Sequence, residues 1–233
     1  MRAAVTIDVE HPDQRRHGGP DQIAAILDAL AVSDIRATFF LQGAWLSANP
    51  EMGAAIGAAG HLVGNHSYHH VDAHLLSGEG MQKDVMRAHQ EIEKILGIDA
   101  RPWYRLPYGA GDSSRAIRRQ LSALGYRHVG WDVDVRDFEA QDDEVVLRAM
   151  ERELSAREDA GATHATVLLH SWPLVTASVM PRLCMLLRRR CEALVTVDEV
   201  PGNGASPVRP GTHDRVAQLL GGVRGAFRRF DGR

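Results

Sequence analysis

The sequence predicts an α/β fold in which parallel strands are joined by crossover helices, as either a barrel or a doubly wound sheet. Short apolar or β-branched segments alternate with longer segments of helical periodicity, and this alternation repeats over roughly 200 residues. Helix start and stop signals stand at several of the borders. With 233 residues, of which 44% are hydrophobic, the chain can bury the core of one domain.

Seven short segments are predicted as strands because they are apolar or β-branched. They are residues 3–8, 37–43, 61–66, 103–107, 128–134, 166–170 and 193–200. Five longer segments with helical periodicity are predicted as helices, at residues 20–32, 78–97, 112–125, 142–159 and 176–192. Pro20 opens the first helix and Ser77 precedes the second. Gly97 and Gly125 close the second and the third, so strand and helix alternate as parallel strands require.

The composition changes at Pro201, after which Pro, Gly and Ser become frequent. We predict one domain over residues 1–200, followed by a linker and C-terminal tail over residues 201–233. The last part of the tail has the pattern of a short basic helix, which the pair Gly221-Gly222 weakens. We expect this tail to dock or fray rather than to anchor a membrane.

The charge and hydropathy of the chain exclude several partners. A formal net charge of −3 gives no basic surface for nucleic acid or anionic lipid. No window holds the roughly 18 to 20 apolar residues of a membrane span, and residues 1–10 lack the apolar centre of a signal peptide. We therefore expect no nucleic acid partner, no membrane span and a cytoplasmic location.

Two cysteines, Cys184 and Cys191, lie in the last predicted helix. Their spacing places them about 10 Å apart along the helix axis, which is too far for a disulfide between them. We expect two free thiols, which suits a reducing compartment.

Ionisable residues stand at or just after the ends of five predicted strands. They are Asp8 and Glu10, His66, Arg105, Asp134 and Asp137, and His170. In α/β barrels the active groups gather where the parallel strands end. One such residue means little, but five such strand ends describe a site if they face one another.

The stretch GNHSYHHVDAH, residues 64–74, holds four of the twelve histidines. His66 and His70 are four residues apart and can present nitrogens on one side of a helical turn. Two imidazoles with one carboxylate form a common open ligand set for a catalytic divalent ion. The same spacing is common among surface and core histidines, so it needs support from elsewhere in the chain. We assign His69 and His74 to the surface or to packing.

The chain resembles the metal-dependent polysaccharide deacetylases, the NodB-homology group or carbohydrate esterase family 4, in six motifs that occur in the same order. They read TIDVE, ATFFLQG, GNHSYHH, YRLPYGAGD, WDVDVRDF and VLLHSWP, and they span residues 3 to about 200. The resemblance implies a distorted (β/α)7 barrel similar to a TIM barrel and one divalent metal ion. It implies a hydrolase of carbon–nitrogen bonds other than peptide bonds, which attacks an N-acetylated amino sugar with metal-activated water and releases acetate.

The resemblance also assigns catalytic roles by position. Asp8 matches the catalytic base, and Arg105 matches the arginine that keeps this carboxylate ionised and oriented. His170 matches the general acid that protonates the departing amine, with Asp137 as its partner. The backbone N–H of Tyr108 matches part of the oxyanion hole. An amide is a weak electrophile with a poor leaving group, so its hydrolysis requires such groups.

The first motif departs from the family, in which two adjacent aspartates are usual. Here Val9 follows Asp8, so the carboxylate ligand is missing from its usual place. Glu10 lies two residues beyond Asp8, on the same side of an extended segment. A D-x-E version of this motif occurs in one branch of the superfamily. We predict Glu10 as the third ligand, with His11 and Asp13 as the alternatives.

The resemblance matches His66 and His70 to the metal-binding histidines of the family, and Glu10 completes the predicted ligand set. Two imidazoles and one carboxylate accept zinc, cobalt, nickel or iron. We expect zinc, with cobalt, nickel and iron as the alternatives.

Four residues are predicted to border the substrate. Trp131 and Asp134 are expected in the pocket wall or just behind it. Phe138 stands where the family usually has Trp, which alters the wall but keeps it aromatic. Trp172 either offers a face on which a sugar ring can stack or fills the core.

The sequence leaves three functions open. The first is N-deacetylation of an amino sugar, and the second is hydrolysis of a cyclic amide or imide on the same fold, to which the D-x-E motif points. The third is a carbohydrate-binding module that has lost catalysis, which only Val9 favours. The exact substrate and the oligomeric state also stay open.

Overall fold

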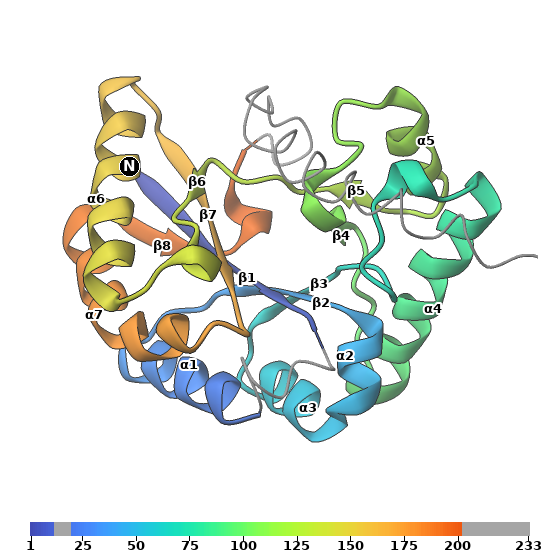
Figure 1. Ribbon diagram of the computed structural model, residues 1–233, viewed down its shortest axis with the longest axis horizontal. Helices are drawn as coiled ribbons and strands as arrows, with labels where there is room; N and C mark the ends of the chain where they lie inside the picture. The colour runs from blue at the N-terminus through green and yellow to red at the C-terminus, as the bar shows by residue number, and fades with distance from the viewer. Residues whose placement is uncertain (12–19, 202–233) are drawn as a thin grey trace, which may run out of the picture.

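The computed structural model describes residues 1–11 and 20–201. Eight strands form one parallel sheet that curves through the middle of the molecule, with helices around its outer side (Figure 1). The predicted α/β fold of parallel strands and crossover helices is confirmed. Asp13 and the predicted tail beyond Pro201 lie outside the described residues.

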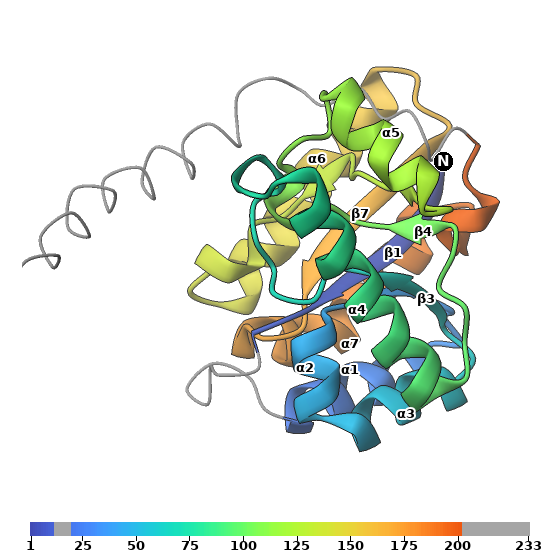
Figure 2. The ribbon, with the colours of Figure 1, turned by 90° about the vertical axis from the view of Figure 1, so that its right-hand side faces the viewer.

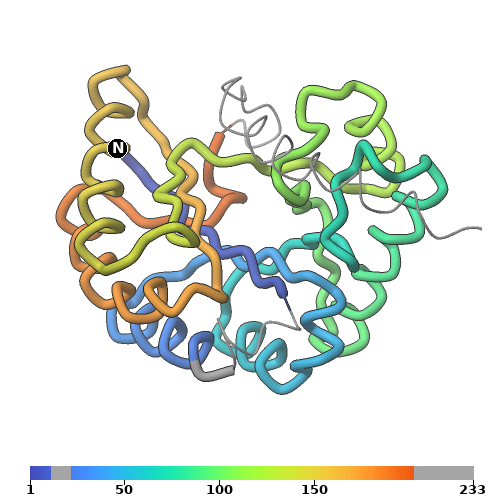
Figure 3. Tube along the Cα trace, in the orientation of Figure 1, coloured from blue at the N-terminus to red at the C-terminus, as the bar shows by residue number. Residues whose placement is uncertain are grey.

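The strands are short except for two that run side by side (Figure 3). They are β1 (Arg2–Val9), β2 (Thr38–Leu41), β3 (Leu62–Asn65), β4 (Trp103–Tyr104), β5 (Arg127–His128), β6 (Val133–Asp134), β7 (His164–His170) and β8 (Ala193–Val195). The α-helices are α1 (Pro20–Val32), α2 (Gly43–Ala48), α3 (Pro50–Ala58), α4 (Gly78–Leu96), α5 (Arg115–Ala123), α6 (Asp143–Asp159) and α7 (Leu174–Arg190). The 3-10 helices are η1 (Ala73–Leu75), η2 (Pro107–Gly109), η3 (Asp137–Glu139) and η4 (Val197–Glu199).

β1 lies at the centre of the sheet, whose strand order is β5-β4-β3-β2-β1-β7-β6. β7 pairs with one edge of β1 from Arg2 to Asp8. β2 and β8 share the other edge, with β2 beside Thr6–Val9 and β8 beside Arg2–Ala4. Residues 3–9 are all buried, as is typical of a parallel strand covered on both faces. Among the described residues no pairing joins β5 to β6, so the sheet is a half-barrel that is open there.

The prediction of one strand over residues 128–134 is wrong, because this segment contributes to two places in the sheet. β5 pairs with β4, and β6 pairs with β7 at the opposite end. Between them, the carbonyls of Val129 and Gly130 accept hydrogen bonds from the Arg105 guanidinium at 3.2 and 3.1 Å. The chain leaves the sheet where a charged side chain, rather than a neighbouring strand, satisfies its carbonyl groups.

The five predicted helices are all present, and their bounds agree with the prediction to within three residues. α4 begins after Ser77, whose hydroxyl accepts the Gly80 N–H, and ends at Gly97 in a left-handed conformation. α2 and α3 are not predicted from the sequence. α2 has only six residues, too few for a helical period to stand out, and α3 follows it directly with Pro50 at its first turn.

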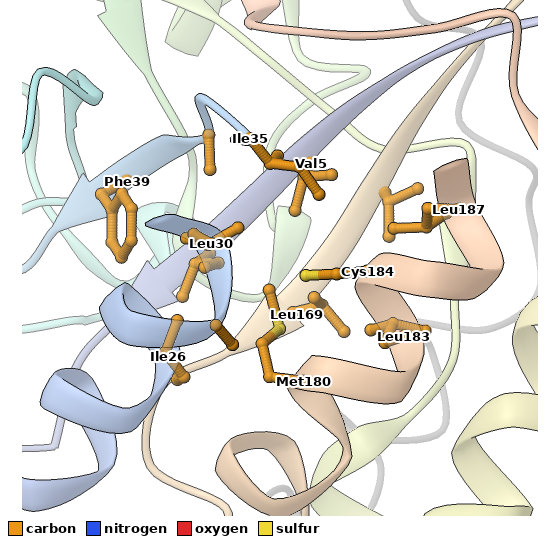
Figure 4. Close-up of a cluster of buried hydrophobic side chains, with 14 of the residues drawn as sticks. Val5, Ile26, Leu30, Ile35, Phe39, Leu169, Met180, Leu183, Cys184 and Leu187 are labelled. Atoms are coloured by element: carbon orange, nitrogen blue, oxygen red, sulfur yellow. The ribbon is translucent and has the colours of Figure 1, made fainter. Parts of the chain in front are cut away.

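Part of the largest cluster of buried apolar side chains lies between β1, β7 and the helices α1 and α7 (Figure 4). The side chains that meet there include Val5, Ile26, Leu30, Leu169, Met180, Leu183, Cys184 and Leu187. Both cysteines are buried and free, as expected. On another side of the sheet, α4 packs along β3 (Figure 2). Full burial of one such side chain contributes about 1.5–3 kcal/mol, so this packing fixes the strands that carry the site.

Within residues 1–11 and 20–201, no helix is both long enough and apolar enough to cross a membrane.

Candidate active site

The carboxyl ends of the parallel strands bring the predicted site residues to one edge of the sheet. In the register of β1 and β7, Asp8 lies opposite His170. β3 and β4 end in register as well, so His66 and Arg105 follow at the same level. Residues that are far apart in the sequence therefore meet because their strands are paired.

A cavity of about 240 Å³ opens at this edge. Every predicted site residue borders it except Arg105 and Asp137, which contact bordering residues from behind. The bordering residues are Asp8, Glu10, His11, His66, His70, Tyr108, Trp131, Asp134, Arg136, Phe138, Leu168, His170 and Trp172. The roles of these residues stay predictions, but their meeting in one place is a property of the fold.

Asp8 and Arg105 form a buried ion pair. Arg105 Nη1 donates to Asp8 Oδ1 and to the Thr6 hydroxyl, each at 2.8 Å. Nε and Nη2 donate to backbone carbonyls, and the guanidinium carbon lies 4.2 Å from the centre of the Phe40 ring. Burial lowers the pKa of Arg105, but the Asp8 charge opposes this shift. The pair fixes one Asp8 oxygen and leaves the other, Oδ2, 3.6 Å from His66 Nε2.

His170 and Asp137 form the second pair. Asp137 Oδ1 lies 2.7 Å from His170 Nδ1, and Oδ2 accepts the His170 backbone N–H at 2.7 Å. The Thr176 hydroxyl and the Phe138 N–H also donate to this carboxylate. Burial lowers the pKa of His170, but the charge of Asp137 and its hydrogen bond outweigh burial and raise the pKa to about 10. His170 is therefore an imidazolium at neutral pH, with Nδ1–H held by Asp137 and Nε2 left for the cavity.

The contacts of His66 define which of its nitrogens carries a proton. Nδ1 lies 2.9 Å from the Arg105 carbonyl oxygen, which can only accept, so Nδ1 is the donor. Nε2 faces two carboxylate oxygens, Asp8 Oδ2 at 3.6 Å and Glu10 Oε2 at 3.3 Å. Burial lowers the pKa of His66, but these carboxylates outweigh burial and raise it. A cation, either a proton or a metal ion, is required between Nε2 and the carboxylates.

Glu10 is the centre of a cluster of three imidazoles and is 4% exposed. Its Oε2 contacts the Nε2 atoms of His66 and His70. Its Oε1 accepts a hydrogen bond from Trp172 Nε1 at 3.0 Å and lies 3.0 Å from His11 Nε2. Burial raises the pKa of Glu10, but the charge of His70 and hydrogen bonds from the three histidines lower it well below its ordinary value. Glu10 is therefore ionised in spite of its burial.

His70 lacks a partner on one side. Its Nε2 contacts Glu10 Oε2, whereas its Nδ1 is buried and has no hydrogen-bond partner among the described residues. Burial lowers the pKa of His70 although Glu10 opposes this, and the neighbouring His66 lowers it further. The two predicted ligand histidines therefore do not both carry an extra proton, and a neutral imidazole is the form that binds a metal.

Backbone strain is concentrated around the cavity. Of the described residues other than glycine, six have a positive φ, and five of these lie at this edge. The five are His11, Ser67, His70, Tyr108 and Arg136, with φ between 51° and 65°. Such conformations cost energy for a residue with a Cβ and persist only where the surroundings impose them. Among the described residues, this strain falls mainly on the segments that shape the site, and Asp34 is the exception.

Acceptor groups anchor the histidine loop. The Ser67 hydroxyl accepts the His70 N–H at 3.0 Å. Asp84 of α4 accepts the backbone N–H groups of Tyr68 and His69 at 3.0 and 3.1 Å, and it lies 2.6 Å from His69 Nδ1. His69 therefore pairs with Asp84 outside the Glu10 cluster, as the prediction of a surface or packing role requires.

His74 also lies outside the cluster. Its side chain is 58% exposed and pairs with Asp72. Of the four histidines of this stretch, His66 and His70 therefore contact Glu10 and the other two lie elsewhere, and their roles stay predictions.

Tyr108 stands at the mouth of the cavity in η2 and is 39% exposed. Its ring packs edge-on against the His70 ring, with centroids 4.5 Å apart. Within the described residues its N–H has no hydrogen-bond acceptor, a property that an oxyanion donor needs. Burial, assisted by Glu10 and Asp72, raises the pKa of its hydroxyl. Its participation in an oxyanion hole stays a prediction.

All four residues predicted to border the substrate border the cavity: Trp131, Asp134, Phe138 and Trp172. Asp134 Oδ1 accepts the Arg136 N–H at 2.9 Å, and burial raises the pKa of this carboxyl group. The Phe138 ring packs edge-on against the His170 ring at 5.2 Å, so the aromatic wall lies beside the predicted acid. Contact with a substrate stays a prediction for all four.

Some features of the site are not predicted from the sequence. Trp172 donates its indole N–H to Glu10, whereas the prediction offers only a stacking face or a core plug. Arg136 and Leu168 also border the cavity, and no signal in the sequence marks them. Their positions depend on how the segment after β6 turns and on which side chains of β7 face inward.

The donor atoms of the cluster suit a divalent ion. In a tetrahedral site with metal–ligand distances of about 2.0–2.2 Å, ligand atoms lie about 3.3–3.6 Å from one another. Glu10 Oε2 and His66 Nε2 are 3.3 Å apart. One ligand atom from each of Glu10, His11 and His70 lies within 4.8 Å of the others. The donor atoms suit the implied ion, and the compact group holds His11 with Glu10 and His70, whereas His66 adjoins it through Glu10 Oε2.

Sequence comparison finds relatives over most of the chain. A family model described as polysaccharide deacetylase matches residues 3–129. Chitin deacetylase from Colletotrichum lindemuthianum is 32% identical over 187 residues, which cover 76% of this chain and 73% of that protein. The chain spans 37% to 57% of the lengths of three further curated relatives.

Solved structures share the fold. A family 4 carbohydrate esterase from Streptomyces lividans in complex with acetate matches with a TM-score of 0.70 at 26% identity, covering 89% of this chain and 98% of that one. A CE4 family pseudoenzyme from Bacillus anthracis matches with a TM-score of 0.74 at 23% identity, covering 85% of this chain and 64% of that one. The second likeness concerns the fold alone. The predicted distorted barrel is confirmed.

Proposed function

Because the chain belongs to the polysaccharide deacetylase family, we propose that it is a divalent-metal-dependent N-deacetylase that releases acetate from an N-acetylated amino sugar. A chitin deacetylase and chitooligosaccharide deacetylases are among its relatives, which supports this substrate class. One observation carries the proposal. An Asp–Arg pair, a His–Asp pair and an imidazole–carboxylate cluster meet at a single cavity.

Asp8 is the proposed proton acceptor. Its Oδ1 accepts a hydrogen bond from Arg105, which fixes the orientation of the carboxylate. Its Oδ2 faces His66 Nε2 across 3.6 Å, beside the proposed ligand atoms. A water molecule that attacks from this cluster would give its proton to Oδ2.

His170 is the proposed proton donor. Hydrolysis of an amide requires a proton on the nitrogen that departs, because an unprotonated amide anion is a poor leaving group. His170 is an imidazolium at neutral pH because Asp137 raises its pKa to about 10. Nδ1 is held by Asp137, so the proton that is transferred is the one on Nε2.

Glu10, His66 and His70 are the proposed ligands of one divalent ion, and we propose zinc because imidazole nitrogens dominate the cluster. Such an ion, when bound, polarises a carbonyl oxygen and lowers the pKa of a water molecule. The Tyr108 N–H is proposed to donate to the acetyl oxygen as negative charge develops on it. The aromatic side chains of Trp131 and Phe138 are proposed to pack against the sugar ring.

The test is acetate release from N-acetylglucosamine oligomers by the chelated protein before and after addition of zinc. We expect release only with the metal. Asp8→Asn should retain zinc and lower kcat by about 10²–10⁴-fold, because an amide cannot take the proton. Asp34→Asn makes the same chemical change at a fully exposed carboxylate and should have no effect. A zinc-loaded protein that releases no acetate from any oligomer would contradict the proposal.

Hydrolysis of a cyclic amide or imide is the second candidate, because Glu10 of the D-x-E motif contacts both predicted ligand histidines. Hydantoin, dihydrouracil and succinimide belong in the same panel of substrates. Ring opening of one of these without acetate release from the oligomers would favour this candidate. A module without catalysis is disfavoured by the completeness of the Asp8–Arg105 and His170–Asp137 pairs, and the panel would detect it as metal binding without turnover.

A further inference from the structure

His11 is the third imidazole that contacts Glu10, and its position depends on an unusual backbone conformation. In an extended chain, consecutive side chains point to opposite faces, so residue 11 would face away from residue 10. His11 instead has φ 64°, and its N–H donates to Gln42 Oε1 at 2.9 Å. This turn directs two consecutive side chains to the same place, against the conformational preference of a residue with a Cβ.

The imidazole of His11 is held at the rim of the cluster. Its Nε2 lies 3.0 Å from Glu10 Oε1, and its side chain is 27% exposed. Its ring packs edge-on against the rings of His70 and Trp172, at centroid distances of 5.5 and 5.2 Å. His66, by contrast, lies at the buried base of the cluster.

Each oxygen of Glu10 faces a different part of this cluster. Oε2 contacts His66 and His70, and Oε1 contacts His11 and the indole N–H of Trp172. Three Nε2 atoms therefore surround one carboxylate. One ligand atom from each of Glu10, His11 and His70 lies within 4.8 Å of the others, which is the compactness that one ion requires. His66 is not in this group and adjoins it through its Nε2 atom, 3.3 Å from Glu10 Oε2.

We propose that His11 is a ligand of the same divalent ion, so that this chain binds its metal with three imidazoles and one carboxylate. The proposal rests on the metal site of the proposed function and extends it. Glu10 supplies the carboxylate that Val9, an apolar residue, cannot supply, and His11 adds a third nitrogen donor. Three nitrogen donors favour zinc, cobalt or nickel over magnesium and manganese, which prefer oxygen.

The first experiment follows the imidazole nitrogens directly. In ¹H–¹⁵N spectra of the full chain labelled at histidine, zinc added to the chelated protein should change the Nε2 signals of His11, His66 and His70 to those of metal-bound imidazoles. His74, exposed and paired with Asp72, is the internal control and should not change. A His11 whose Nε2 signal keeps its unbound value in the zinc-loaded protein overturns the proposal.

The second experiment measures zinc affinity by competition with a chromophoric chelator. His11→Ala should weaken zinc binding by about 100-fold or more. Loss of a contact outside the ligand shell weakens metal affinity by about 10–100-fold, so a ligand should cost at least the upper value. His74→Ala should bind like the unchanged chain, and circular dichroism of the metal-free variants checks their folding. Unchanged affinity in His11→Ala overturns the proposal.

The outcomes separate this proposal from the proposed function. Zinc bound by Glu10, His66 and His70 alone, with acetate release, overturns the role of His11 and leaves the deacetylase intact. Three metal-bound histidines without any turnover support the role of His11 and contradict the deacetylase. A chain that binds no divalent ion overturns both.

Discussion

The acid–base pairs and the Glu10 cluster border the same cavity, yet they differ in how far the protein completes them. In the pairs, each charged group meets its partner within the chain, at 2.8 Å between Arg105 and Asp8 and at 2.7 Å between His170 and Asp137. In the cluster, His66 directs Nε2 at carboxylate oxygens, and His70 Nδ1 has no partner among the described residues. The pairs are complete without a ligand, whereas the cluster requires a cation.

This difference indicates how the two regions respond to the metal. A buried charge is tolerated when an opposite charge and hydrogen bonds satisfy it, which holds for both pairs. Removal of the metal should therefore leave the pairs as they are and alter only the cluster. Asp8 is the link between the regions, because one of its oxygens binds Arg105 and the other faces His66.

The largest effect is expected from the ligand histidines. In His66→Ala or His70→Ala, the cluster loses a nitrogen that contacts Glu10, so zinc should no longer remain bound after desalting, as measured by elemental analysis. Acetate release should cease with it. The His170 imidazole should keep its raised pKa in both variants, which NMR titration checks. Retention of zinc at full occupancy in either variant would show that the cluster is not the metal site.

The second largest effect concerns the His170–Asp137 pair. The pKa of His170 is raised to about 10, so the protonated acid is present at neutral pH and is lost as the pH rises through about 10. In Asp137→Asn the charge that raises this pKa is gone, so it should fall toward the ordinary value of 6.5 and activity should decline from neutral pH upward. At pH 8 a group with a pKa near 6.5 is only about 3% protonated, so we expect kcat to fall by about 30-fold, with zinc content unchanged.

NMR titration of the metal-free protein measures the same shift without catalysis. The pair also stabilises the folded state, because the raised pKa favours the folded protonated form. This stabilisation is fully present below pH 6.5 and is lost as the pH rises through about 10. An Asp137→Asn protein with the pH profile of the unchanged chain would contradict the assigned role of Asp137.

The two regions were not equally predictable from the sequence. Asp8, His66, Arg105 and His170 stand at or just after the ends of β1, β3, β4 and β7, so the register of these strands brings them together. The contacts on Glu10 Oε1 are harder to predict from the sequence. The approach of His11 depends on one positive φ, and that of Trp172 depends on the turn after β7, and neither leaves a local pattern.

The split of residues 128–134 has the same cause. The segment carries strand propensity throughout, but two-residue strands are decided by distant partners, here β4 for one half and β7 for the other. The charged side chain of Arg105 donates hydrogen bonds to the carbonyls between the two strands. Local strand propensity cannot predict that a side chain from another element will take the place of a neighbouring strand as the hydrogen-bond donor to these carbonyls.

A smaller effect is expected from the anchor of the histidine loop. Asp84 accepts two backbone N–H groups and contacts His69 Nδ1, so it fixes the segment between the two ligand histidines. In Asp84→Asn one acceptor oxygen is lost, and zinc affinity should weaken by about 10–100-fold, as for other outer contacts of metal sites. The pH profile set by His170 should not move. Affinity equal to that of the exposed Asp34→Asn control would limit Asp84 to a role in folding.

The smallest effect distinguishes the two regions through their aromatic neighbours. Trp172 donates to Glu10 at 3.0 Å, whereas Phe138 packs on His170 at 5.2 Å and contacts no proposed ligand. Trp172→Phe keeps an aromatic ring but loses the N–H, and because water can replace that donor, zinc affinity should weaken by only about threefold to tenfold. Phe138→Leu should raise KM for the oligomers and leave zinc affinity unchanged, because it removes wall area without touching the cluster. If Trp172→Phe instead raises KM and leaves the affinity unchanged, Trp172 belongs to the substrate wall rather than to the support of Glu10.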